Sequence, residues 1–170
     1  MAIKLIQGRP QGLLPAAWDA LKGFPIEASQ VVQTVGEAKP SGKTHEPDGT
    51  FTNEEGQSEE YCAAVDLSVL HPEELNRDQI KVLLGRLTDA GFAPFARLPG
   101  QDHWLDPEHI HAIWADCPMK DLLRNQVHSF CDVPMLNGLR SNVPYKFWQP
   151  TPVQQQGVRE RFLAHNPADH

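Results

Sequence analysis

The stretch Asp106-Pro107-Glu108-His109-Ile110-His111-Ala112-Ile113-Trp114 contains a dense cluster of metal-ligating residue types. In an extended strand, alternate side chains point to the same face, so His109 and His111 share one face. In a helix, Glu108 and His111 share a face instead, because they are three residues apart. The β-branched residues that follow favour the strand. The stretch therefore predicts a strand with two histidines on one face.

A second candidate strand, Tyr61–Leu70, carries the carboxylate of Asp66 in the middle of a mostly apolar run. A buried carboxylate must be ion-paired, hydrogen-bonded or bound to a cation, because burying it bare costs too much free energy. The alternative is an Asp66 side chain that points to solvent from a half-exposed strand. If the two candidate strands are antiparallel neighbours, Asp66 and His111 come within a few ångströms of each other.

The remaining sequence patterns indicate helices and strands on both sides of these two segments. Helices are predicted at Pro15–Lys22, Pro72–Gly91, Met119–Phe130 and residues 153–164, and further strands at Ser29–Val35 and Phe92–Leu98. Asn76 or Asp78 is a candidate N-cap of the second helix, and Pro94 indicates an edge strand or a bulge. The segment Glu37–Glu60 has almost no aliphatic residue and is predicted to be a long loop, which contains His45.

This order of elements predicts an α+β fold, with a small and mostly antiparallel sheet packed with helices. The chain of 170 residues is long enough to bury roughly 70% of the surface that its unfolded form exposes. Residues 1–150 are expected to form a single domain, and residues 151–170 a C-terminal tail with a short helix.

Charge and composition argue against several classes of partner. The net charge is −7 and there is no basic block, so nucleic acid is not expected as the main partner. No apolar run approaches the ~20 residues of a membrane span. The segment Met1–Gln7 is too short and too mixed for a signal peptide, so the protein is expected to be cytoplasmic or released by cell lysis.

The candidate ligands suit a catalytic zinc site, which needs three protein ligands and an open fourth position. The candidates are His45 in the polar loop, Asp66, and either His109 or His111. A nearby carboxylate or histidine must move protons between water and the leaving group. Glu108 or Asp106 is then left for proton transfer.

Two of these segments resemble the metal motifs of the D-alanyl-D-alanine metallopeptidases. Tyr61–Leu67 resembles the end of the first motif, Ser-x-His-x-x-Gly-x-Ala-x-Asp, with Ala64 at its alanine and Asp66 at its metal-binding aspartate. Glu108-His109-Ile110-His111 resembles the second motif of this superfamily, which includes the hedgehog signalling domain. It fits both the Glu-x-x-His and the His-x-His variant, with His111 as the ligand in each. The resemblance covers residues 30 to 115.

The first motif departs from the family pattern at two positions. The family histidine lies seven residues before the aspartate, where this chain has Glu59, and Cys62 replaces the motif glycine. Three arrangements remain open. His45 is the ligand from an expanded loop, Glu59 replaces the histidine, or the site has lost its metal.

The resemblance implies that His45, Asp66 and His111 hold Zn²⁺, and that Glu108 acts first as general base and then as general acid. It also implies that His109 stabilises the oxyanion or assists proton transfer. The implied protein is a zinc-dependent peptidase of the D-Ala-D-Ala carboxypeptidase, dipeptidase or endolysin type, with a peptidoglycan-derived peptide as substrate.

The role of Glu108 requires a kink at Pro107, because in a regular strand its side chain points away from His111. Without the kink, Asp106 or His109 takes over the proton transfer. Two other interpretations remain. The chain is a non-catalytic binding or structural module on the same fold, or the resemblance arises by chance.

Overall fold

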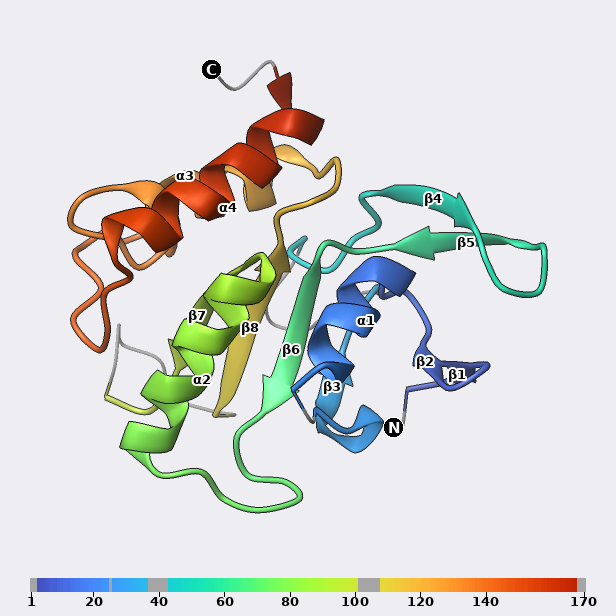
Figure 1. Cartoon of the computed structure of the whole chain (residues 1–170), viewed down its shortest axis with the longest axis horizontal. Helices are drawn as coiled ribbons and strands as arrows, with labels where there is room; N and C mark the ends of the chain where they lie inside the picture. Colours follow the sequence, from blue (N-terminus) through green and yellow to red (C-terminus); the bar gives the residue numbers. More distant parts are fainter. Residues whose placement is uncertain (1–2, 25, 37–42, 101–107, 168–170) are drawn as a thin grey trace.

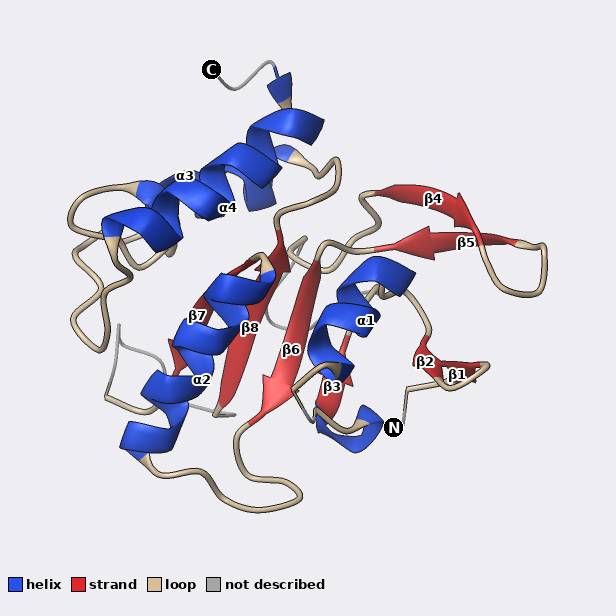
Figure 2. Ribbon diagram, in the orientation of Figure 1, coloured by secondary structure: helices blue, strands red, loops and turns tan. Residues whose placement is uncertain are grey.

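A four-stranded antiparallel sheet forms the centre of the computed structural model, which describes residues 3–24, 26–36, 43–100 and 108–167 (Figure 1). In spatial order its strands are β3 (Val31–Gln33), β6 (Ala64–Ser68), β8 (His109–Trp114) and β7 (Phe92–Arg97). Two small hairpins lie outside it, formed by β1 (Leu5–Ile6) with β2 (Arg9–Pro10), and by β4 (Gly49–Thr52) with β5 (Ser58–Tyr61). The helices are α1 (Pro15–Lys22), α2 (Arg77–Ala90), α3 (Asp121–Cys131) and α4 (Pro152–His165), and a short 3-10 turn η1 covers Ala28–Gln30. Helices and antiparallel strands together confirm the predicted α+β class (Figure 2).

The two faces of the sheet differ in chemistry. Residues directly opposite each other on neighbouring strands share a face, so Leu67 and Ile110 lie on one face and Asp66 and His111 on the other. Helices α1 and α2 lie side by side in front of the sheet in the view of Figure 1. Helix α3 reaches the face that carries Asp66, where its Phe130 ring makes an edge contact with Phe95 of β7. Helix α3 therefore covers part of the face that carries these polar residues, and shields them from water.

Local capping interactions set both ends of helix α2. Asn76 and Gln79 form a reciprocal capping box, which confirms Asn76 as the N-cap. Gly91 ends the helix in the left-handed conformation with φ 114°, a backbone geometry that glycine adopts without steric cost. The chain then enters β7, the outer strand of the sheet, as expected from Pro94.

The exposed edge of β7 is covered by a tyrosine from the segment after α3. The hydroxyl of Tyr145 accepts the backbone N–H of Ala96 at 2.8 Å and donates to the carbonyl of the same residue at 3.2 Å. A side chain thus satisfies backbone groups that an unprotected edge strand offers to other strands.

Two sequence-based predictions about the region before β6 are wrong. The segment Glu37–Glu60 is not all loop, because β4 and β5 form a hairpin within it; residues 37–42 lie outside the described residues. Tyr61–Leu70 is not one strand, because the chain leaves β5 at Tyr61 and begins β6 at Ala64. Between the two strands, the N–H of Cys62 donates to the carbonyl of Gly12. This hydrogen bond lies where the chain passes from the hairpin into the sheet.

A buried ion pair joins the β4–β5 hairpin to the N-terminal segment. Arg9 Nη1 lies 2.8 Å from Glu59 Oε2, and Nη2 lies 2.8 Å from an oxygen of Glu54. Glu59 also accepts the backbone N–H of Gly12 and an amide N–H of Asn53. Burial alone raises the pKa of Glu59, but the hydrogen bonds from these groups outweigh it and lower the pKa to about 2.

Helix α4 contributes Val158 and Phe162 to the same hydrophobic core as the sheet, and it packs against α2 and α3. Within residues 3–24, 26–36, 43–100 and 108–167, no helix combines the length and the apolar character needed to cross a membrane.

Candidate metal centre

Three of the predicted ligands converge on one point of the sheet. Asp66 of β6 and His111 of β8 are directly paired across the two central strands, and His45 reaches them from the preceding loop. Nδ1 of His111 lies 3.0 Å from Oδ1 of Asp66, and Nε2 of His45 lies 3.1 Å from Oδ2. One potential ligand atom from each residue lies within 4.8 Å of the other two, so the group could hold a metal ion.

All three side chains are removed from water. His45 is 1%, His111 5% and Asp66 9% exposed. Burial lowers the pKa of His111, which favours the neutral imidazole. Burial alone raises the pKa of Asp66, but hydrogen bonding to His111 and His45 outweighs it and holds that pKa well below its usual range. A charged carboxylate and a neutral imidazole are the forms in which these residues bind metals.

The far side of each imidazole ring is held by a carbonyl oxygen. Nδ1 of His45 lies 2.6 Å from the backbone oxygen of Thr34, which can only accept, so this nitrogen carries a proton. Nε2 of His111 lies 2.8 Å from the side-chain oxygen of Gln126. Metal-bound histidines are characteristically oriented in this way, with the other ring N–H donating to a carbonyl or carboxylate oxygen.

This arrangement brings together atoms that accept hydrogen bonds. Because the Nδ1 proton of His45 points to Thr34, its Nε2 and the Asp66 carboxylate meet across either a second proton or a cation. Two acceptors in contact repel each other unless a proton or a cation lies between them. The residues therefore fit a bound cation, and a set of two imidazoles and one carboxylate suits zinc.

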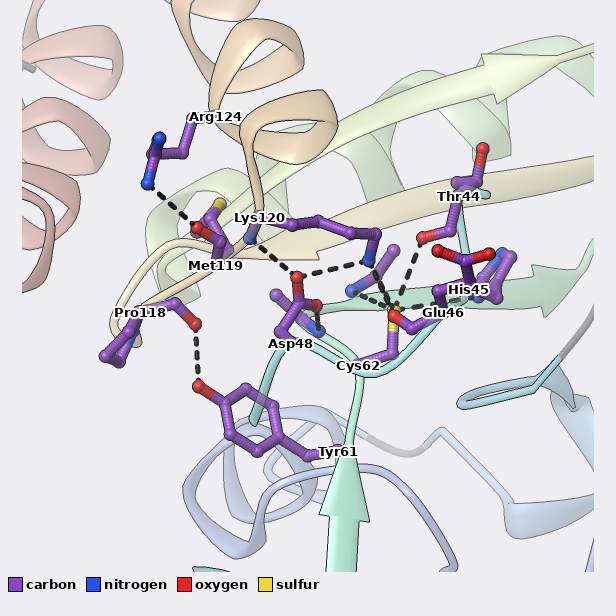
Figure 3. A network of polar contacts seen from close by, with 12 residues as sticks. Thr44, His45, Glu46, Asp48, Tyr61, Cys62, Pro118, Met119, Lys120 and Arg124 are labelled. Carbon is purple, nitrogen blue, oxygen red and sulfur yellow. Dashed lines mark hydrogen bonds and ion pairs between the residues drawn. The ribbon is translucent and has the colours of Figure 1, made fainter. Parts of the chain in front are cut away.

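The loop that carries His45 is attached to helix α3 and to the start of β6 through Asp48 (Figure 3). The Asp48 side chain is fully buried. One of its oxygens accepts the N–H of Ala63 at 2.7 Å, and the other accepts the N–H of Lys120 at 2.7 Å and its Nζ at 3.1 Å. Nζ of Lys120 also donates to the carbonyl of Glu46 at 2.7 Å. The backbone that follows His45 is thereby fixed relative to the sheet.

We expect Asp48→Asn to destabilise the protein and to weaken metal binding. An amide offers one acceptor oxygen, so its NH₂ group must face the N–H of either Ala63 or Lys120. Leaving a buried donor unpaired costs about 1–3 kcal/mol of unfolding free energy. Loosening the loop should also lower zinc affinity by roughly tenfold, in the range of other outer-shell changes. Urea unfolding and zinc titration measure the two effects.

Glu46→Gln is the matched control for this substitution, because Glu46 is exposed and contributes its backbone carbonyl to the contact with Lys120. Both its unfolding free energy and its zinc affinity should equal those of the wild type. An unchanged zinc affinity in Asp48→Asn would contradict the positioning of His45 by Asp48.

Glu59 does not take part in this group. It lies on β5 and is bound to Arg9, Gly12 and Asn53, in a hairpin outside the main sheet. The arrangement of the structure therefore brings His45, and not Glu59, to Asp66 and His111.

The predicted proton-transfer residues His109, Glu108 and Asp106 differ in their position relative to the three ligands. His109 shares the face of Asp66, with its Nε2 3.9 Å from Oδ2 of Asp66. Strand β8 is regular from His109 onward and is paired with β6 and β7 along its length. Glu108 lies just before this strand and outside the group of three ligands. Asp106 lies outside the described residues.

Gln126, whose side-chain oxygen lies against the far nitrogen of His111, was not among the predicted site residues. Its signal was its position, because it lies on the same side of α3 as Leu123, Val127 and Phe130, where an apolar residue is expected. Thr34 and Asp48 gave no comparable signal, because Thr34 contacts His45 through a backbone carbonyl that any residue offers, and Asp48 contacts Lys120 from 72 residues away. No protein-family model, curated protein or solved structure matches this chain.

Proposed function

We propose that the chain is a zinc-dependent peptidase that hydrolyses a peptide bond in cell-wall peptides of the D-Ala-D-Ala type. The main support for a metal site is the convergence of His45, Asp66 and His111. The far nitrogens of both imidazoles are also hydrogen-bonded to carbonyl oxygens. Three protein ligands leave a fourth position for water or substrate, as catalytic zinc requires. A closed structural site would use four protein ligands.

The choice of substrate rests on the resemblance of Tyr61–Leu67 and Glu108–His111 to the two metal motifs of the D-alanyl-D-alanine metallopeptidases. A fold of the hedgehog and D-Ala-D-Ala peptidase type belongs to the same proposal. Bound zinc would polarise the scissile carbonyl and lower the pKa of water to about 7. Nε2 of His45, Nδ1 of His111 and the Asp66 carboxylate are the atoms that would hold it.

Among the residues that the structure describes, His109 is the side chain best placed to move a proton. It lies on the same strand face as His111 and close to the Asp66 carboxylate, which can orient its ring. An imidazole can take a proton from water and return it to the leaving amine near neutral pH. Glu108 would need a turn in the chain before β8 to reach the same position.

Hydrolysis of D-Ala-D-Ala and of peptidoglycan stem peptides tests this proposal directly. We expect the zinc-loaded protein to release free amines from such peptides, and a chelator to abolish the reaction until zinc is restored. His109→Asn should lower kcat by roughly 100-fold without lowering zinc content, because it removes a proton carrier and no ligand. Amine release and elemental analysis measure both quantities.

His128→Asn is the control, since His128 packs against Phe162 on the other side of α3 and should leave kcat unchanged. A protein that binds one zinc ion and cleaves none of these peptides would contradict the peptidase proposal. It would instead support a non-catalytic module on this fold.

A further inference from the structure

Helix α3 places one polar side chain among its core residues. Gln126 is 8% exposed, while Leu123, Val127 and Phe130 on the same side of the helix are fully buried. Burying an amide is unfavourable unless it is hydrogen-bonded. The partner of this amide is the metal-site histidine, His111.

Both ring nitrogens of His111 are engaged. Nε2 lies 2.8 Å from Oε1 of Gln126, and Nδ1 lies 3.0 Å from Oδ1 of Asp66. Oε1 of Gln126 accepts the Nε2–H, so in a neutral ring bound to a cation Nδ1 is the nitrogen that presents its lone pair. The backbone oxygen of Thr34 acts on His45 in the same way, but through Nδ1, which leaves Nε2 for the site.

We propose that Gln126 is a positioning residue of the metal site, whose side-chain carbonyl holds His111 in the Nε2–H tautomer and makes Nδ1 the metal-binding atom. The Nε2–Oε1 contact sets which nitrogen keeps its proton once Nδ1 binds a cation, and its role towards zinc rests on the proposed function. Helix α3 thereby supports both histidines, because Lys120 at its start also fixes the loop of His45 through Asp48. An outer-shell acceptor of this kind orients the ring and raises its basicity as a ligand.

Three variants separate this role from a general contribution to packing. Gln126→Leu keeps similar bulk but removes the acceptor, and Gln126→Glu keeps an acceptor oxygen and strengthens it by charge. Gln155→Leu is the matched control, because Gln155 is a similarly buried glutamine on α4 that donates to the carbonyls of Phe130 and Asp132. Each protein is titrated with zinc against a chromophoric chelator.

We expect Gln126→Leu to bind zinc roughly 10–100-fold more weakly than the wild type. Gln126→Glu should bind at least as tightly as the wild type, which also keeps the test valid if the leucine variant does not fold. Gln155→Leu should lose stability and keep its zinc affinity. Wild-type affinity in a folded Gln126→Leu protein, or a loss in Gln126→Glu equal to that in the leucine variant, would overturn the proposal.

The atom bound to the metal can be read by NMR of ¹⁵N-histidine-labelled wild-type protein loaded with zinc. We expect the His111 Nδ1 resonance to move to the metal-bound range and Nε2 to keep its proton. Metal-bound Nε2 in His111 would overturn the inference. If zinc binding depends on Gln126 but the protein cleaves no peptide, the proposed function is contradicted and the role of Gln126 stands. A wild type that binds no zinc would overturn both.

Discussion

Replacing Asp66 with asparagine is expected to weaken zinc binding by a few hundredfold and to abolish peptide hydrolysis. Zinc sites with four protein ligands bind with about 10–16 kcal/mol, so one ligand accounts for roughly 3–4 kcal/mol. Asp66 also supplies the negative charge of the site, and it is the residue that both His45 and His111 contact. Competition with a chelator measures the affinity, and peptide cleavage measures the activity.

The metal-free Asp66→Asn protein should be less stable than the metal-free wild type at pH 8, because the substitution removes a carboxylate whose pKa is lowered in the folded protein. Zinc at 100 times its Kd should raise the wild-type unfolding free energy by about 2.7 kcal/mol and Tm by ~5–10 °C, but should not stabilise the variant. An equal zinc-induced rise in both proteins would contradict a site built on Asp66.

Glu59→Gln is expected to cost ~3 kcal/mol of unfolding free energy at pH 7. The substitution leaves the buried guanidinium of Arg9 with Glu54 as its remaining carboxylate, and removing one partner of a buried ion pair is strongly destabilising. The pKa of Glu59 is about 2 in the folded protein against an ordinary value of 4.5, and a difference of this size corresponds to ~3 kcal/mol.

The sign of this pKa change sets the pH range of the effect. Because the folded-state pKa is lowered, the stabilisation is complete above the ordinary value of 4.5 and is lost as the pH falls towards about 2. The difference in unfolding free energy between wild type and Glu59→Gln should therefore shrink from ~3 kcal/mol at pH 7 to ~1 kcal/mol at pH 3. Urea titrations at the two pH values measure it.

Asp19→Asn provides the control, because the pair between Asp19 and Lys22 on α1 is largely exposed and should contribute less than ~1 kcal/mol. A loss in Glu59→Gln that is the same at pH 3 and pH 7 would show that packing, and not the charge of Glu59, is responsible.

The main elements of the fold could be predicted because they depend on local patterns. Apolar residues at helical spacing, with Asn76 before and Gly91 after, identify α2 without any tertiary information. Alternation and β-branched residues identify β8 in the same way. The β4–β5 hairpin was missed because its strands are short and polar, and its stability comes from a contact between Glu59 and the distant Arg9.

The candidate site could be predicted in part for similar reasons. Asp66 and His111 stand out as polar residues in apolar strands, and antiparallel pairing of those strands brings them together. His45 was identifiable as a residue type, but its position depends on Asp48 and Lys120, which are 72 residues apart. Contacts of this kind leave no periodic pattern in the sequence.

The distances along the chain between the three ligands have a consequence for folding. Asp66 is 21 residues from His45 and 45 residues from His111, so one ion held by all three closes two long loops. Such a closure acts as a cross-link, comparable in kind to the disulfides of secreted proteins, whereas all three cysteines here are free thiols. Sheet pairing alone brings Asp66 to His111, and the loop must then deliver His45. The metal ion would therefore join His45 to Asp66 and His111, which strand pairing has already brought together.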